Sequence, residues 1–168
     1  MQTISKIIAK GIYDYTGLQV VPTDNPNKRP EYPYFSYKIT SSLLNTGESG
    51  AYEYSFVDSL NDRFKKDVLE KVTIQQKVVV SFNSYSNNLA DSLQNVLDAW
   101  DWFKLSGRHT LALDNIVVVN IGNIQDRTIV IVDNYEYRQG FDVELRVTRE
   151  IENRLETIED YKIKGEFR

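Results

Sequence analysis

The chain has 168 residues, a formal net charge of −4 and a pI of about 5.1. It contains no Cys and one His, which excludes disulfides, thiolate chemistry and metal sites built from clusters of these residues, and we expect the chain to fold in an intracellular setting. The acidic balance argues against a general nucleic-acid-binding protein, and no stretch approaches the roughly 20 apolar residues that span a membrane. Residues 1–16 lack a signal-peptide pattern, and the length fits a single domain, expected over residues 1–168.

The first 40 residues predict a helix, a loop and a strand. Apolar side chains recur at helical spacing in residues 3–15, which predicts an amphipathic helix, and Gly17 is placed to end it. Residues 18–33 hold all four prolines and predict an extended loop. Residues 34–40 alternate between apolar and polar side chains, as a half-buried strand does.

Residues 41–70 form the segment that is hardest to interpret. Residues 44–50 are polar and contain two glycines, which predicts a loop or a hairpin tip, whereas residues 58–71 fit either a short helix or a frayed arm. An excursion of this length is often functional.

A strand over residues 72–82 is followed by the clearest helix of the chain. Asn88 can cap this helix and Gly107 can end it. At about 100° per residue the expected buried face consists of Leu89, Leu93, Val96, Leu97, Trp100 and Phe103. Trp102 then projects among acidic and amide side chains, so another surface must cover it. That surface is either the 41–70 excursion or a partner protein.

The remaining residues predict a run of strands. Residues 116–121 and 128–132 are rich in β-branched side chains, and residues 122–126 between them suit a hairpin turn. Residues 137–148 predict a long strand whose inward side chains are Phe141, Val143, Leu145 and Val147. The charged tail, residues 150–168, fits a helix or an extended arm. The order of elements predicts an α+β fold, with a mainly antiparallel sheet, two amphipathic helices on one face and an extended loop or arm.

We find no catalytic, cofactor-binding or metal-binding motif, and we expect no enzymatic activity and no cofactor. His109 follows a helix alone, and a lone loop histidine is far more often structural than catalytic. Asp98 and Asp101 share one helical turn on a solvated face, which suits solubility better than acid–base chemistry. Glu136, Arg138 and Asp142 form a charged group at a strand start, which indicates a surface ion pair or a charged contact across a subunit boundary.

Four stretches, in this order, resemble the tail or neck terminator proteins of tailed bacteriophages. They are residues 12–21, which end the first helix, residues 29–34, which close the proline loop, residues 80–86, which lead into the second helix, and residues 135–143, which open the long strand. Together they span nearly the whole chain, and their order and spacing carry the resemblance.

The resemblance implies a structural virion protein. It implies a ring, usually a hexamer, that caps the completed tail tube, stops its polymerisation and provides the joint to the head. The expected partners are therefore further copies of the chain, the tail-tube protein and a head-completion or connector protein. DNA would pass through the lumen without specific binding, and the protein would be assembled in the host bacterial cytoplasm and reside in the tail or neck of the virion.

A closed ring uses heterologous interfaces, in which two different patches of each protomer meet. We expect polar and aromatic side chains to supply these patches, and the candidates are Trp102, Tyr32, Tyr34, Tyr52, Tyr54, Glu136, Arg138 and Asp142. Two alternatives remain: another head–tail joining adaptor, such as a head-completion or connector protein, or a cytosolic ligand-binding domain.

Overall fold

The computed structural model describes residues 2–26, 28–44, 47–132 and 134–157. The chain divides into two compact units: unit 1 is formed by residues 1–46 and 76–147, and unit 2 by residues 47–75 and 148–168. Strands β4 (Lys66–Ser86) and β8 (Asn134–Glu156) contribute residues to both units. The single domain expected over residues 1–168 stays a prediction.

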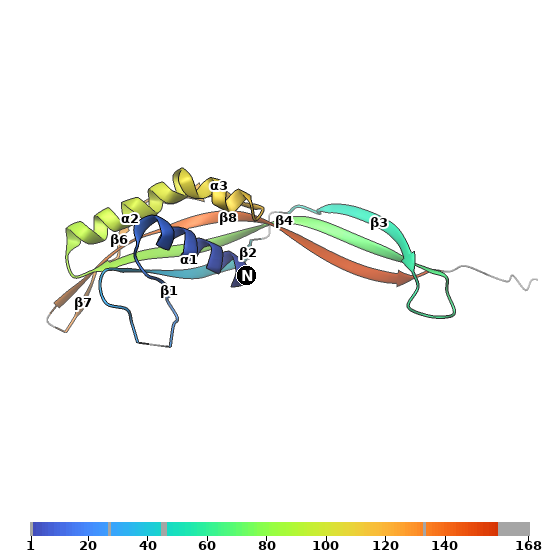
Figure 1. The fold of residues 1–168 in the computed structure, drawn as a ribbon, viewed down its shortest axis with the longest axis horizontal. Coiled ribbons are helices and arrows are strands. Elements are labelled where there is room, and N and C mark those ends of the chain that lie inside the picture. The colour runs from blue at the N-terminus through green and yellow to red at the C-terminus, as the bar shows by residue number, and fades with distance from the viewer. Residues whose placement is uncertain (1, 27, 45–46, 133, 158–168) are drawn as a thin grey trace, which may run out of the picture. The chain divides into compact units, whose positions relative to one another are not determined.

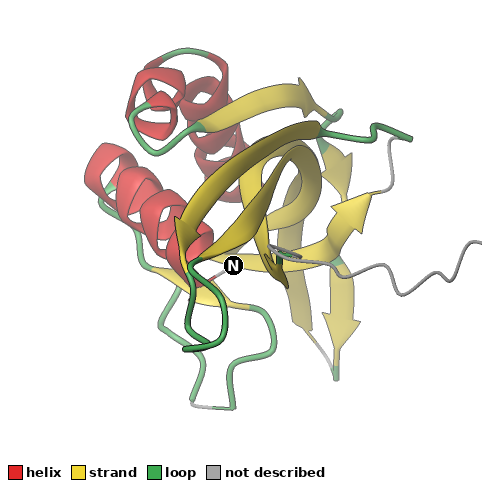
Figure 2. Cartoon of the chain, turned by 90° about the vertical axis from the view of Figure 1, so that its right-hand side faces the viewer, coloured by secondary structure: helices red, strands yellow, loops and turns green. Residues whose placement is uncertain are grey.

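Unit 1 packs three described helices against one face of its strands (Figure 1). The helices are α1 (Gln2–Thr16), α2 (Leu89–Lys104) and α3 (Ser106–Ala112). The further strands are β1 (Val20–Pro22), β2 (Tyr34–Leu44), β5 (Ile116–Ile121), β6 (Gln125–Asp126) and β7 (Ile129–Ile131). Figure 2 shows the helices together on one side of the strands. The predicted α+β class is confirmed, with α3 as a helix that the sequence analysis did not separate from α2.

The sheet is mainly antiparallel, as predicted. The strand order is β1-β2-β4-β8-β5, and β1 runs parallel to β2 within the segment that we predicted as a loop. Strands β2 and β4 pair antiparallel, with Phe35 opposite Ser84 and Tyr37 opposite Phe82. Residues 116–121 and 128–132 do not form the expected hairpin with each other, because β5 and β7 both pair with β8.

The core of unit 1 lies between the helices and the sheet. The four side chains predicted to face inward on β8, Phe141, Val143, Leu145 and Val147, are all buried. They pack with apolar side chains of α1, α2, β2 and β4: Ile8, Ile12, Phe35, Val78, Val80, Phe82, Val96 and Phe103.

The helix ends are explained by local chemistry. Gly17 adopts a positive φ of 74° and donates its N–H to the Tyr13 carbonyl, which ends α1 as expected. At the start of α2, Asn88 Oδ1 accepts the Asp91 N–H at 2.8 Å, the predicted cap. Gly107 does not end α2, which stops at Lys104. It lies inside α3 instead.

The predicted outward direction of Trp102 is wrong. Its side chain is only 3% exposed, and it lies against two glycines, one on α1 and one on α3. A Cβ placed on Gly11 would be 2.3 Å from Trp102 Cζ2, and one on Gly107 would be 2.6 Å from Trp102 Cδ2. The prediction assumed that α2 buries one face, whereas α2 packs on the sheet and also on α1 and α3, so a second face is covered.

The predicted apolar face of α2 is therefore only partly correct. Val96 and Phe103 are buried as expected, but Leu89, Leu93 and Leu97 are exposed. The buried side chains of α2 are Ser92, Val96, Ala99, Trp102 and Phe103. Trp100 is half-buried at the margin of the core and donates its indole N–H to the Gly122 carbonyl at 3.2 Å.

Unit 2 contains the excursion and the described part of the charged tail. Strand β3 (Ala51–Asp58) pairs antiparallel with β4, with Tyr54 opposite Glu70, so residues 51–75 form a hairpin and not a short helix. For the charged tail, the predicted alternative of a helix is wrong as far as Glu156, because β8 continues to that residue. Residues 158–168, for which we predicted a helix or an arm, lie outside the described residues.

Candidate functional site

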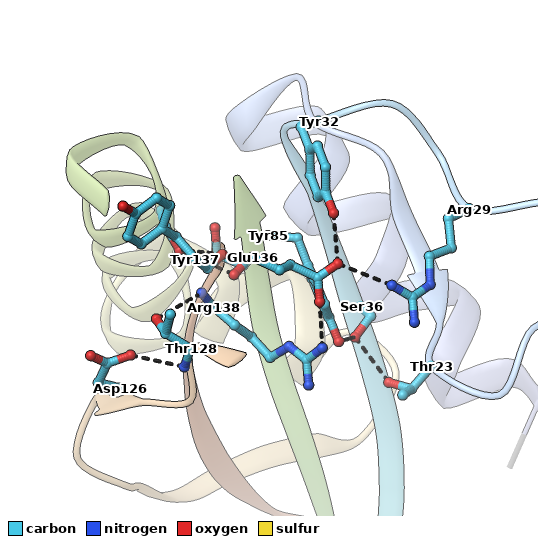
Figure 3. Close-up of polar contacts among 12 residues, drawn as sticks. Thr23, Arg29, Tyr32, Ser36, Tyr85, Asp126, Thr128, Glu136, Tyr137 and Arg138 are labelled. Atoms are coloured by element: carbon cyan, nitrogen blue, oxygen red, sulfur yellow. Dashed lines mark hydrogen bonds and ion pairs between the residues drawn. The ribbon is translucent and has the colours of Figure 1, made fainter. Parts of the chain in front are cut away.

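A buried carboxylate lies on the face of the unit 1 sheet that is turned away from the helices. Glu136, on β8, has a side chain only 2% exposed. Its Oε1 accepts hydrogen bonds from Tyr32 Oη at 2.6 Å and from Arg29 Nη1 at 3.0 Å. Its Oε2 accepts one from Arg138 Nη2. Figure 3 shows Glu136 between these three side chains, two of which come from the proline loop.

The charges around Glu136 keep it ionised. Burial alone would raise the pKa of the Glu136 carboxyl, but the hydrogen bonds from Tyr32 and Arg138 and the charges of Arg138 and Arg29 hold this pKa below its usual value. The same contact acts on the other partner: burial and the hydrogen bond to Glu136 raise the pKa of Tyr32 to about 12. The tyrosine therefore stays a donor and the carboxylate an acceptor at neutral pH.

Aromatic rings extend this cluster across the strands. Tyr34 stacks on Tyr85 of β4 with ring centroids 4.7 Å apart, and Tyr32 stacks on Tyr34 at 5.7 Å. The Arg138 guanidinium lies 4.7 Å from the Tyr85 ring centroid, within cation–π range. Residues of the proline loop, β2, β4 and β8 are thus joined in one network, which we call the Glu136 clamp (Arg29, Tyr32, Tyr34, Tyr85, Glu136 and Arg138).

The clamp explains three corrections to the predicted interface residues. Tyr34 is 3% exposed and Glu136 is also buried, so neither side chain is free to contact another subunit. Arg138, with a side chain 21% exposed, is held between Glu136 and Tyr85. Alternation along the strand predicted that these side chains face outward, but it did not reveal that the proline loop covers them.

Asp142 does not belong to the clamp. Its carboxylate is half exposed and accepts a hydrogen bond from Arg127 Nη2 at 3.1 Å. Arg127 also donates to Ser81 and Asn83 of β4. The charged group predicted from the sequence is therefore divided: Glu136 and Arg138 pair within the clamp, whereas Asp142 pairs separately with Arg127.

Unit 2 carries a second feature, an aromatic row on β3. Tyr52, Tyr54 and Phe56 alternate along the strand and are 53%, 64% and 73% exposed. Tyr54 Oη donates to Glu70 Oε1 across the hairpin at 3.1 Å. Both tyrosines were among the predicted interface residues and Phe56 was not, although the period-2 alternation of residues 52–56 was the signal for all three.

Neither feature has the chemistry of an active site. The described residues contain no group of three or more His, Cys, Asp or Glu side chains that could hold a metal ion. Among the helices that the structure describes, none is long and apolar enough to cross a membrane. What the two features offer is a loop tied to the sheet by hydrogen bonds and an exposed aromatic surface.

Comparison with known proteins gives the family. A family model described as phage neck terminator protein matches residues 2–168. The chain belongs to this family. No curated protein matches the sequence. The resemblance found in four stretches of the sequence is thereby confirmed over nearly the whole chain, and this neck terminator family member has a structural role in the phage neck.

Within a neck terminator protein, the predicted interface residues divide by exposure. Tyr32, Tyr52, Tyr54 and Asp142 present surface to solvent, Arg138 is half-buried, and Trp102, Tyr34 and Glu136 are buried within their own chain. Trp102 is thus removed from the candidate interface. Tyr52 and Tyr54, from the aromatic row of unit 2, are the most exposed aromatic side chains among the residues predicted for contact.

Proposed function

We propose that this protein forms a closed ring, a hexamer, that caps the completed tail tube, stops tube polymerisation and provides the surface to which a head-completion or connector protein joins. The proposal is supported by membership of the phage neck terminator family over residues 2–168. The protein is assembled in the host bacterial cytoplasm and becomes part of the virion neck.

The observation that carries the proposal is the lack of a core in unit 2. Every buried hydrophobic residue of the described chain lies in unit 1, whereas β3 exposes two tyrosines and a phenylalanine. A sheet with an uncovered apolar face marks a protein contact. A structural protein that must bind copies of itself and two partners needs such surface, and it needs no active site.

A tube-elongation assay tests this function. Tail-tube protein is polymerised with increasing amounts of this protein, and the tube lengths are measured by negative-stain microscopy. We expect the mean length to fall as capped ends accumulate. Tubes that grow equally long at every ratio would contradict the capping role, and binding to purified portal or head-completion protein without tube capping would assign the chain to the alternative, a head–tail joining adaptor.

A further inference from the structure

Unit 2 is a three-stranded antiparallel sheet, and we call it the arm. Its described strands are β3, residues 66–75 of β4 and residues 148–156 of β8. The one buried side chain among them is that of Asp67, which accepts a hydrogen bond from Arg154 Nη1 at 3.1 Å. Three strands become independently stable when an apolar face is covered, and within the arm nothing described covers one.

The arm has two distinct faces. One face carries the ion pairs between β4 and β8, Lys71 with Glu150 and Asp67 with Arg154. The other face holds Glu70, which accepts hydrogen bonds from Tyr54 and Asn153. By strand alternation Glu70 and Asn153 share this second face with mostly apolar side chains: Tyr52, Tyr54, Phe56, Val68, Val72, Ile151 and Leu155.

Both edges of the arm are unpaired within the described chain. Strand β3 pairs with β4 alone, and residues 148–156 of β8 likewise have β4 as their one neighbour. Natural edge strands are usually blunted by Lys, Pro or a bulge. β3 contains neither Lys nor Pro, and its register with β4 runs without a shift from Ala51 to Asp58. An edge of this kind is a template for another strand.

The two edges fit each other. Strands β3 and β8 both run antiparallel to β4, so they share one direction, and each presents apolar side chains to one face and polar ones to the other. When β3 of one copy joins the β8 edge of the next, both faces of the sheet continue across the junction. Each copy contributes one edge of each kind, which is the heterologous geometry that closes into a ring.

We propose that β3 of each copy pairs, in parallel, with residues 148–156 of β8 of the neighbouring copy, so that the arms join into one continuous sheet around the ring. The partner is a second copy of this chain, because one copy offers both complementary edges. This inference rests on the ring of the proposed function and adds the contact that builds it.

Disulfide cross-linking tests the contact, because the chain contains no Cys. Ser55→Cys on β3 is combined with either Glu150→Cys or Glu152→Cys on β8, all at exposed positions. Within one copy these positions are separated by β4, about 9.6 Å for two strand spacings, which is beyond the roughly 7 Å limit for a disulfide. We expect oxidation of one of the double variants to give covalent multimers up to the ring size, and each single variant to stay uncross-linked.

Three outcomes would overturn the inference. Rings seen by negative stain in which neither double variant cross-links would refute the edge contact and leave the ring itself standing. Dimers from Ser55→Cys alone would show that β3 of one copy pairs with β3 of another copy. A chain that forms no ring, either free or at tube ends, would refute the proposed function and this contact together.

Discussion

Trp102 shows how one residue ties three helices together. Its ring occupies the space that a Cβ on Gly11 or Gly107 would need. Trp102→Ala should cost about 3–5 kcal/mol of unfolding free energy, because it leaves a cavity among α1, α2 and α3. Chemical denaturation measures this cost, and a loss below about 1 kcal/mol would contradict the packing.

Gly11 allows a sharper test of the same contact. Gly11→Ala should destabilise the protein by about 1–3 kcal/mol, because the new methyl group meets the indole. In a Trp102→Ala background the same change should be neutral or stabilising, since alanine favours a helix by roughly 0.5–1 kcal/mol over glycine. Additive effects of the two substitutions in a double-mutant cycle would refute the clash.

Glu136 should contribute to acid sensitivity. The pKa of its carboxyl is lowered in the folded state, so its contribution to stability is complete above the unfolded pKa of about 4.3 and is lost as the pH falls through the lower folded value. Glu136→Gln should therefore destabilise the protein at pH 7, and the difference from wild type should shrink below about pH 4.3.

The control for this measurement is Asp142→Asn. This carboxylate is half exposed and pairs with Arg127, so its removal should cost less than about 1 kcal/mol. Urea denaturation at a series of pH values compares the two variants. A difference between Glu136→Gln and wild type that is constant from pH 7 to pH 3 would exclude the ionised clamp.

At the scale of elements, local patterns predicted most of unit 1. The alternation of β8, the cap at Asn88 and the positive φ at Gly17 each depend on neighbouring residues alone, and each was predicted correctly. The direction of Trp102 was not, because it depends on the packing of α2 against α1 and α3. The buried state of Glu136 and Tyr34 likewise depends on the distant proline loop.

For the excursion, residues 41–70, the predictions were a loop or hairpin tip over residues 44–50 and a short helix or a frayed arm over residues 58–71. Residues 41–70 mix polar and apolar side chains, and the arm joins residues far apart in the sequence, as the Asp67–Arg154 ion pair across 87 residues illustrates. The signal was present in the alternating aromatics of β3, but the strand on the other side of β4, residues 148–156 of β8, lay in a tail whose charges suit a helix equally well. Pairing over such distances cannot be deduced from periodicity.

The aromatic row of β3 gives a prediction about assembly. Tyr52→Ser combined with Tyr54→Ser should abolish ring formation, measured by light scattering, and change the unfolding free energy by less than about 1 kcal/mol, because both side chains are exposed. The matched control is Tyr13→Ser with Tyr15→Ser on α1, two tyrosines each 52% exposed. Equal loss of assembly in both pairs would show that the arm has no special role.

For the whole molecule, net charge gives a prediction about DNA binding by the proposed ring. A net charge of −4 disfavours phosphate contacts, so we expect DNA to pass through the lumen of the proposed ring without binding. Gel retardation at low salt should detect no complex with duplex DNA. A complex that weakens steeply with added salt would instead indicate a basic binding surface.

The capped tube is the central claim, and imaging of tube ends tests it most directly. Purified tail tubes are mixed with this protein and examined by cryo-electron microscopy with class averages of the ends. We predict a six-fold ring seated at one end of the tube. A protein that stays monomeric at every concentration and leaves both ends bare would contradict the account.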